Sequence, residues 1–279
     1  MTQFKKILDI LPSALVSRTF GAVSAIEFPA KIQHFINHGF AGIAGLNLDE
    51  ALNPIDDYKS LNDLFTRELK PEARPIESAN VVSPVDGKLS FMGKIQDGTI
   101  IEAKGHDYSV SQLIGMESEN NWENHAYAFT IYLSPANYHR IHSPISGQIT
   151  AMSYVPGRLL PVNRLGYLIA DDLLPANERL TSIMTDKLGH HVDMVKVGAT
   201  CVGKISIVYD DMKTNASLFR KPFHKTLEQP WGVNAGDEVG CFELGSTIVL
   251  IVDSEGFIPS PELKTGQKIQ LGTALGNWS

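Results

Sequence analysis

The segment Phe242-Glu243-Leu244-Gly245-Ser246-Thr247-Ile248-Val249 places a Gly-Ser dipeptide between two apolar, strand-like runs. Glycine has no Cβ, so the backbone at Gly245 can adopt conformations closed to other residues, and a neighbouring group can approach its carbonyl closely. The hydroxyl of Ser246 can reach that carbonyl. Such a bond suits a chain that cleaves itself and leaves a modified serine at a new N-terminus. The alternative is a strand with a bulge, because Gly and Ser are common turn residues.

Short apolar runs like those beside this dipeptide recur throughout the chain after Pro71. They are rich in Val, Ile, Leu and Thr and alternate with Gly and Pro turns. The clearest are 81–82, 88–91, 99–101, 126–133, 148–154, 194–201, 204–208 and 246–252. This spacing predicts a mainly antiparallel β sandwich or barrel-like core. Residues 157–190 fit the pattern less well, and we expect an excursion with loops that borders a pocket.

Two of the turns resemble each other, which indicates a small internal repeat. Ser83-Pro84-Val85-Asp86-Gly87-Lys88-Leu89 and Ser143-Pro144-Ile145-Ser146-Gly147-Gln148-Ile149 both read Ser-Pro, two residues, Gly and then a strand. The repeat puts Asp86 and the region of His142 at equivalent turns.

The first part of the chain has a helical pattern instead. Apolar residues fall at i, i+3 and i+4 spacings, as at Ile7, Leu8, Leu11, Ala14 and Leu15 and again at Ile32, Phe35, Ile36 and Phe40. Basic residues outnumber acidic ones in the first forty positions, which favours contact with an anionic membrane surface. The alternative is a helix pair packed on the protein's own core. Ser60 and Asp63 then predict a capped short helix that runs through Leu69.

These patterns predict the α+β class, with two regions. Residues 1–60 would form an amphipathic, helical region that docks on a membrane or on the protein's own core, and residues 61–279 a β-rich domain that carries the candidates for chemistry. Apolar residues make up 43% of the chain, which is ordinary for a globular protein. The net charge of −7 argues against a nucleic-acid partner. Cys201 and Cys241 are too few for a disulfide framework.

No apolar run reaches the length of about 18 residues that a transmembrane helix needs. A cleaved signal peptide is an alternative interpretation of the N-terminus, but Asp9 and Pro12 interrupt its apolar stretch.

The segment His139-Arg140-Ile141-His142 is the second candidate for chemistry. Two histidines three positions apart could bind zinc, with His190, His191 or Asp193 as a third ligand. The pattern is loose and no His-Glu-x-x-His is present, so we predict no metal. Histidine also titrates near neutrality and could accept the proton of Ser246, with a carboxylate such as Asp86 to orient it.

Taken together, these segments resemble the phosphatidylserine decarboxylase family. The resemblance runs in order from about residue 60 to about residue 252. It is carried by Leu61-Asn62-Asp63-Leu64-Phe65-Thr66-Arg67-Glu68-Leu69-Lys70-Pro71, Pro84-x-Asp86-Gly87, Tyr138-His139-Arg140-Ile141-His142-Ser143-Pro144, Tyr154-Val155-Pro156-Gly157, Asn177-Glu178-Arg179, Val197-Gly198-Ala199-Thr200-Cys201-Val202-Gly203 and Leu244-Gly245-Ser246-Thr247.

The resemblance implies a proenzyme that cleaves itself between Gly245 and Ser246. Asp86, His142 and Ser246 would form the self-cleavage triad, with His142 as the base. The hydroxyl of Ser246 would attack the Gly245 carbonyl to form an ester, and elimination followed by loss of ammonia would leave a pyruvoyl group. The large chain, 1–245, and the small chain, 246–279, would stay together as a heterodimer, with further dimerisation left open.

The resemblance also implies the reaction. The pyruvoyl group, a covalent pyruvate cofactor, would form a Schiff base with the amine of phosphatidylserine, and His139 would be the acid/base for decarboxylation. The products would be phosphatidylethanolamine and CO2, made by a carboxy-lyase in phospholipid biosynthesis. We expect a peripheral protein on the cytoplasmic side of the cell membrane. Charge alone makes Arg140, Arg158, Arg164 and Arg179 candidates to bind the substrate phosphate.

Three other functions are kept open. One is a pyruvoyl decarboxylase of a soluble amino acid, which the amphipathic N-terminus disfavours. Another is a biotinyl or lipoyl carrier module, which would need an exposed acceptor lysine at a hairpin tip, and no such motif is visible. A zinc peptidase of similar β texture would need a close His-x-His, which the sequence lacks.

Overall fold

The computed structural model describes residues 13–102, 106–115, 122, 125–162, 166, 170, 172–200, 204–215, 221–243 and 246–279. Gly245, on one side of the predicted cleavage bond, and Cys201 lie outside these ranges. Ser246 lies within them.

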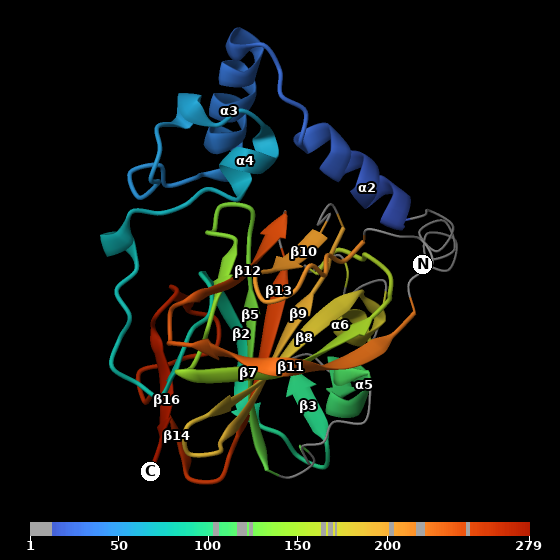
Figure 1. Cartoon of the computed structure of the whole chain (residues 1–279), viewed down its shortest axis with the longest axis vertical. Coiled ribbons are helices and arrows are strands. Elements are labelled where there is room, and N and C mark those ends of the chain that lie inside the picture. Colours follow the sequence, from blue (N-terminus) through green and yellow to red (C-terminus); the bar gives the residue numbers. More distant parts are fainter. Residues whose placement is uncertain are drawn as a thin grey trace.

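The molecule has two parts, a helical end and a body made mainly of β-sheets (Figure 1). Helices α2 (Ser13–Ser24), α3 (Ala30–Ala44) and α4 (Leu61–Phe65) gather at the N-terminal end, with the 3-10 turn η1 (Ile55–Asp57) between the last two. A second turn, η2 (Pro71–Ala73), leads into the sheets, which also carry the short helices α5 (Val110–Ile114) and α6 (Leu173–Ala176). The arrangement confirms the predicted α+β class.

The largest sheet has eight strands in the order β11-β7-β8-β9-β13-β5-β2-β15, all antiparallel. Their bounds are β11 Phe223–Val233, β7 Gly147–Val155, β8 Arg179–Asp186, β9 His191–Val197, β13 Thr247–Asp253, β5 Ala126–Tyr132, β2 Gly87–Lys94 and β15 Lys268–Ile269. β13 begins directly after Ser246 and lies between β9 and β5, with every residue but the last buried. Ser246 therefore stands at the entry to a central core strand.

Smaller sheets surround this one. β10 (Lys204–Ile207), β12 (Glu238–Glu243) and β6 (Arg140–His142) form one, and β6 carries part of the histidine segment. β1 (Val81–Val82), β16 (Ala274–Trp278) and β14 (Phe257–Pro259) form another. β3 (Thr99–Glu102) pairs with β4 (His106–Ser109). Apolar side chains from the large sheet and its neighbours make one continuous core that includes Phe129, Phe242 and Leu250.

Two local predictions differ from the structure. Residues 179–186 form β8, in the middle of the large sheet, so the predicted excursion is wrong for this part. Because Thr181 and Ser182 are polar, the sequence of β8 does not have the apolar pattern of a core strand, although both side chains are buried. The Ser60 cap is confirmed, because its Oγ accepts from the Asp63 N–H at 3.0 Å, but α4 ends at Phe65. Beyond it the chain becomes extended, where the Glu68 carbonyl accepts from Leu52 N–H at 2.9 Å.

The two Ser-Pro turns are equivalent in the structure, which confirms the repeat. Ser83 Oγ donates to the Val85 carbonyl, and Ser143 Oγ donates to the Ile145 carbonyl, both at 2.7 Å. The turns also bond each other reciprocally. Val82 N–H donates to the Pro144 carbonyl and His142 N–H to the Pro84 carbonyl, each at 2.9 Å. This pairing sets the turn of Asp86 directly beside His142.

A buried lysine interrupts the apolar core. Lys196, on β9, is fully buried, and its Nζ donates to Ser182 Oγ. Ser182 Oγ in turn lies 2.5 Å from the hydroxyl of Tyr209, which follows β10. Burial lowers the pKa of Lys196 to about 7. The amine is therefore largely neutral just above neutral pH, because a charge without a partner is costly in an apolar interior.

We expect Lys196→Met to change how stability depends on pH. The unfolded lysine has a pKa of about 10.4, so between about pH 7 and pH 10 the unfolded wild type binds more protons than the folded one, and its stability rises with pH. The variant should be more stable than wild type near pH 7 and should lack this rise. Urea unfolding at several pH values measures both effects, and an unchanged slope would contradict the assignment.

Candidate functional site

His142, at the end of β6, is held as a neutral base. Its Nδ1 lies 2.8 Å from the Gly236 carbonyl, and because a carbonyl only accepts, Nδ1 carries the proton. Nε2 is then the acceptor, 3.2 Å from the hydroxyl of Tyr138. Burial lowers the pKa of His142, which favours the neutral form. The side chain therefore presents a basic Nε2 of fixed tautomer.

Asp86 is held from another side of the same turn pair. Arg74 donates to it through Nε at 2.8 Å and Nη2 at 2.6 Å, and Leu271 N–H donates at 2.9 Å. Among the described residues Asp86 shares no hydrogen bond with His142, whose Nδ1 is oriented by the Gly236 carbonyl instead. Burial lowers the pKa of His142, while the nearby carboxylate of Asp86 acts in the opposite direction. Asp86 is thus linked to His142 by charge and through the backbone of Pro84.

Ser246 is fully buried between its two neighbouring strands. Its Oγ donates to the Val197 carbonyl, at the end of β9, and its carbonyl accepts from Leu133 N–H at 2.8 Å. Within the described part of the chain the hydroxyl makes no hydrogen bond to either histidine. Leu133 opens the loop that leads to His139, whose carbonyl accepts from Phe242 N–H at 2.9 Å. Backbone contacts on both sides of Ser246 thus lead to the histidine segment.

His139 has an unusual buried nitrogen. The ring is fully buried and packs against Phe65, with centroids 3.9 Å apart and the ring planes tilted by 37°. Nδ1 lies 2.8 Å from the Asn137 carbonyl and so carries the proton. Nε2 has no hydrogen-bond partner among the described residues. Burial, with the charge of Arg67 second, lowers the pKa of His139 to about 3.

Arg67 is a candidate that the sequence prediction missed. Its side chain is buried, and Nη2 donates to the Ala136 carbonyl at 3.3 Å. Nε and Nη1 find no partner within the described structure. A buried guanidinium with unpaired donors is costly, so such a group suits an anionic ligand. The only signal in the sequence was its place in the motif at residues 61–71, which also supplies Phe65.

Two of the arginines predicted to bind phosphate are already engaged. Arg140 pairs with Glu238 at 3.0 Å and with Glu68 at 3.2 Å. Arg179 donates to several backbone carbonyls, including that of Gln112 at 2.6 Å. Arg158 carries contacts of its own, and Arg164 lies outside the described residues.

The zinc alternative receives no support from the geometry. His139 and His142 each direct Nδ1 to a different backbone carbonyl. The remaining nominated ligands have other partners, since His190 pairs with Asp186 at 2.8 Å and Asp193 accepts from Trp122 Nε1 at 2.8 Å. Within the described ranges these residues form no group of three that could hold an ion.

Comparison with known proteins agrees with the site. A family model described as phosphatidylserine decarboxylase matches residues 61–277. The chain belongs to the phosphatidylserine decarboxylase family. A phosphatidylserine decarboxylase proenzyme of Brevibacillus brevis is 40% identical over 276 residues, which cover 96% of this chain and 95% of that protein.

Other relatives give the same result. Proteins of the same description from Shewanella amazonensis and Myxococcus xanthus are 41% and 34% identical, each over 276 residues. These alignments cover 96% and 98% of this chain, and 94% and 97% of the relatives. They therefore include α2 and α3, which lie outside the family model. The family confirms the predicted enzyme, a carboxy-lyase that decarboxylates phosphatidylserine, over the carrier module and the soluble amino-acid decarboxylase.

We expect Arg74→Met to destabilise the fold strongly. The change would leave Asp86 buried without its cationic partner, and removing one member of a buried ion pair costs about 3–5 kcal/mol. Lys225→Met is the matched control, because Lys225 pairs with Asp210 at 2.6 Å at an exposed position and should matter little. Urea unfolding of the two variants tests this, and equal losses would contradict the role given to Arg74.

Proposed function

We propose that the chain matures by cleaving itself between Gly245 and Ser246, into chains 1–245 and 246–279 that stay together, and then decarboxylates phosphatidylserine at a membrane surface. The observation that carries the proposal is that two neighbouring buried groups, His139 Nε2 and two nitrogens of the Arg67 guanidinium, find no hydrogen-bond partner among the described residues. Buried polar atoms are almost always hydrogen-bonded. Two such groups beside the histidine segment suit a site that is completed by an anionic substrate.

His142 has the features that the cleavage step needs. Once Ser246 Oγ leaves the Val197 carbonyl, Nε2 of His142 can accept its proton, while the Nδ1–H bond to Gly236 keeps the tautomer correct. The oxygen would then attack the Gly245 carbonyl carbon and convert the amide to an ester. The carboxylate of Asp86 favours the imidazolium that results. Tyr138 must release Nε2 for this step, because its hydroxyl occupies it in the structure.

The surroundings of Ser246 fit a pyruvoyl group. The residue is anchored by its continuation into β13, by Leu133 N–H on its carbonyl and by the adjacent β9 carbonyl of Val197. When formed, a pyruvoyl group supplies a ketone that takes the substrate amine and accepts the electron pair released with CO2. The chain's part is to hold this carbonyl in a dry, fixed position at the head of a buried strand.

Arg67 and His139 would act on the substrate. An anionic group of phosphatidylserine would give Nε and Nη1 of Arg67 the partners that they lack. His139 is neutral in the structure, because its pKa is lowered to about 3. A negative charge beside the ring would raise that pKa. Nε2 could then hold a proton and deliver it to the carbon that has lost CO2.

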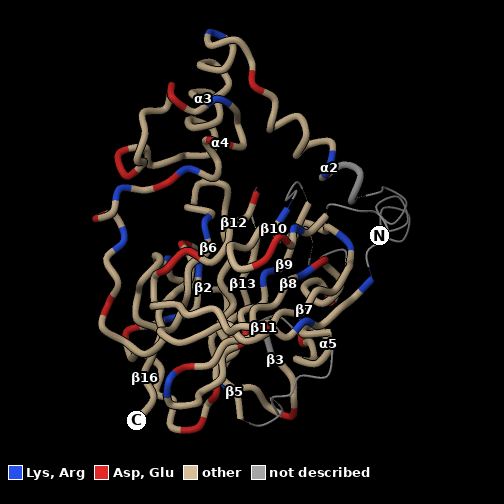
Figure 2. The backbone as a smooth tube through the Cα atoms, viewed as in Figure 1, with Lys and Arg blue, Asp and Glu red and all other residues tan. Residues whose placement is uncertain are grey.

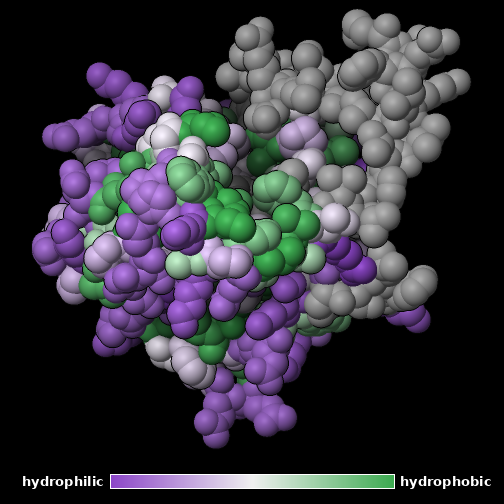
Figure 3. All heavy atoms as spheres, turned by 90° about the horizontal axis from the view of Figure 1, so that it is seen from above, coloured by the Kyte–Doolittle hydropathy of each residue, from purple (hydrophilic) through white to green (hydrophobic). Residues whose placement is uncertain are grey.

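The N-terminal helices present an apolar surface rather than hiding one. The buried residues of α3 are Gln33, Asn37 and Ala41, whereas Phe35 and Ile43 are 76% and 91% exposed. A helix of a soluble protein buries its apolar face. Figure 3, viewed onto this end, shows hydrophobic side chains gathered there, and Figure 2 shows few charges on α2 and α3. The charges that they carry are the cations Arg18 and Lys31, which suit an anionic lipid surface.

An apolar pocket opens among these helices. Its volume is about 180 Å³, and its lining is almost entirely apolar. The lining residues are Phe20, Val23, Ser24, Ile26, Phe28, Gln33, Ile36 and Leu61. No helix in the described part of the chain is long and apolar enough to cross a membrane. The exposed apolar residues of α3 and the cations of α2 and α3 support our proposal that the protein is peripheral, on the cytoplasmic side of the cell membrane, with both helices against the lipid.

Cleavage should depend on His142 and not on His139. We expect Ser246→Ala and His142→Ala to remain single chains, and Asp86→Asn to process slowly, because each change removes the nucleophile, the base or the charge that supports the base. His190→Gln, a change at a histidine with no role in the proposal, should process like wild type. Denaturing electrophoresis of freshly purified protein shows the outcome. Complete processing of His142→Ala would contradict its role as the base.

Turnover should depend on His139 and Arg67 after normal cleavage. We expect His139→Ala to decarboxylate phosphatidylserine in mixed micelles at least about 100-fold more slowly, the usual scale for loss of a general acid–base group. Arg67→Met should also be slower, because the substrate anion loses its cationic partner. CO2 release from carboxyl-labelled substrate measures the rate. If His139→Ala failed to cleave, or turned over normally, the division of roles between the two histidines would not hold.

Membrane binding should depend on the exposed apolar side chains of α3. We expect the double variant Phe35→Asp, Ile43→Asp to lose most of its co-sedimentation with phosphatidylserine-containing vesicles, while self-cleavage continues. Ile258→Asp is the matched control, since Ile258 is 62% exposed on β14 in the β body. Equal losses in both variants would refute the docking surface.

A further inference from the structure

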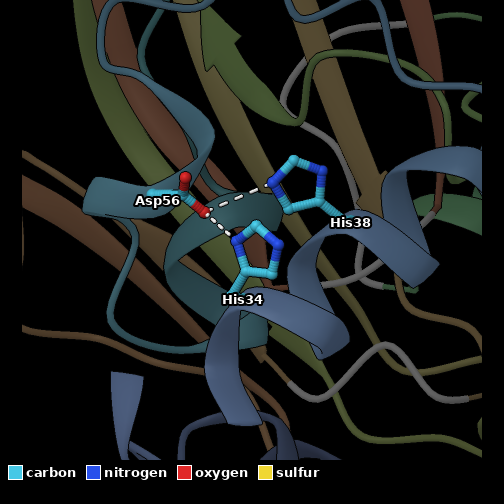
Figure 4. A group of neighbouring side chains, drawn as sticks. All are labelled: His34, His38 and Asp56. Carbon is cyan, nitrogen blue, oxygen red and sulfur yellow. Dashed lines mark hydrogen bonds and ion pairs between the residues drawn. The ribbon is translucent and has the colours of Figure 1, made fainter. Parts of the chain in front are cut away.

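Two histidines of α3, neither of them assigned to catalysis, converge on one carboxylate (Figure 4). His34 Nδ1 lies 2.7 Å from Asp56 Oδ1, and His38 Nε2 lies 3.3 Å from the same oxygen. Asp56 belongs to η1, a separate segment that packs against α3. The three potential ligand atoms all lie within 4.8 Å of one another.

We infer that His34, His38 and Asp56 form a binding site for a divalent cation of the zinc class. Histidines at i and i+4 lie on one helical face and can share an ion. Tetrahedral zinc takes nitrogen and oxygen ligands at about 2.0–2.1 Å, which sets ligand atoms about 3.3 Å apart. The His38–Asp56 separation already has this value, and the His34–Asp56 separation needs to open by roughly 0.6 Å.

The backbone that carries Asp56 is fixed without any ion. Asn37, fully buried on α3, donates through Nδ2 to the Ile55 carbonyl at 3.1 Å and to the Tyr58 carbonyl at 2.9 Å. Gln33 Nε2 donates to Asn37 Oδ1 at 2.7 Å and holds that amide in place. These bonds bracket Asp56 on both sides. The carboxylate therefore stands opposite the two rings in advance, which reduces the ordering cost of binding.

The site is accessible to an ion from solvent, and its three protein ligands are one fewer than a closed tetrahedral site has. All three side chains are exposed, so an ion can enter from solvent and keep water in the remaining position.

A bound ion would brace the membrane-docking helix. It would link α3 to η1, two segments that are otherwise held together by the hydrogen bonds of Asn37 and by packing. Around α3, Ile43 lies away from His34 and His38. The ring of Phe35 meets that of His34 edge-on, with centroids 5.7 Å apart, so the ion would border the apolar surface. The site therefore stabilises the docking region and stays apart from the chemistry at Ser246.

Zinc titration of the purified, self-processed protein, stripped with a chelator and dialysed, tests the site. We expect isothermal calorimetry to show one zinc equivalent at micromolar affinity or tighter. His38→Gln and Asp56→Asn should each weaken this binding by at least about tenfold, because each removes a direct ligand. The matched control is His190→Gln, which disrupts another close His–Asp pair, His190–Asp186 at 2.8 Å, and should leave the binding unchanged.

A second readout separates ligand loss from misfolding. Zinc should raise the thermal midpoint of wild type and of His190→Gln but not of His38→Gln. Without zinc, the midpoints of wild type and His38→Gln should agree, because His38 is exposed. Cobalt in place of zinc should give wild type the strong visible absorption of a four-coordinate site. His38→Gln and Asp56→Asn should not show this absorption. Equal zinc affinity in wild type and His38→Gln, or no binding at micromolar zinc, would overturn the inference.

Discussion

The site depends on the reciprocal pairing of two Ser-Pro turns. Val82 N–H bonds the Pro144 carbonyl and His142 N–H bonds the Pro84 carbonyl, which locks the two halves of an internal repeat together. The repeat extends to the loops that follow, because the Ser83 carbonyl accepts from Gly272 N–H and the Ser143 carbonyl from Gly236 N–H, each at 2.9 Å. Both glycines have positive φ, which a side chain would strain. This symmetry sets Asp86 beside His142 and brings the Gly236 carbonyl within hydrogen-bond distance of Nδ1 of His142.

Two kinds of polar side chain occur in the interior. Some have their hydrogen bonds and charges paired within the protein, and others keep atoms to which a ligand could bind. Arg74 and Asp86 form a complete buried pair, which holds a turn in place. Arg67 and His139 keep atoms that are unpaired within the described ranges, at a cost to stability that a protein sustains mainly where function requires it. This contrast distinguishes a structural arginine from one that can bind substrate, although both lie in the same stretch before the first strand.

Much of this was readable from the sequence, for identifiable reasons. Apolar runs predicted β2, β5, β7, β9 and β13 of the large sheet but not β8, β11 or β15. The Ser-Pro repeat predicted that Asp86 and the region of His142 stand at equivalent turns. β8 was missed because Thr181 and Ser182 are polar, and their burial depends on neighbours distant in sequence. The sequence also could not predict the contact of the Gly236 carbonyl with His142, or the donors of Arg67 that find no partner among the described residues. Both depend on which backbone groups fold against these side chains. Likewise, the meeting of Asp56 with His34 and His38 follows only from the packing of η1 on α3.

The central claim is that Ser246 is consumed to make the cofactor. Intact mass spectrometry of the purified protein tests it directly. The account predicts two species, residues 1–245 with a free carboxyl end and residues 246–279 lighter by one ammonia than a chain that begins with serine. A single full-length species in an active preparation, or a small chain with an ordinary N-terminal serine, would contradict it.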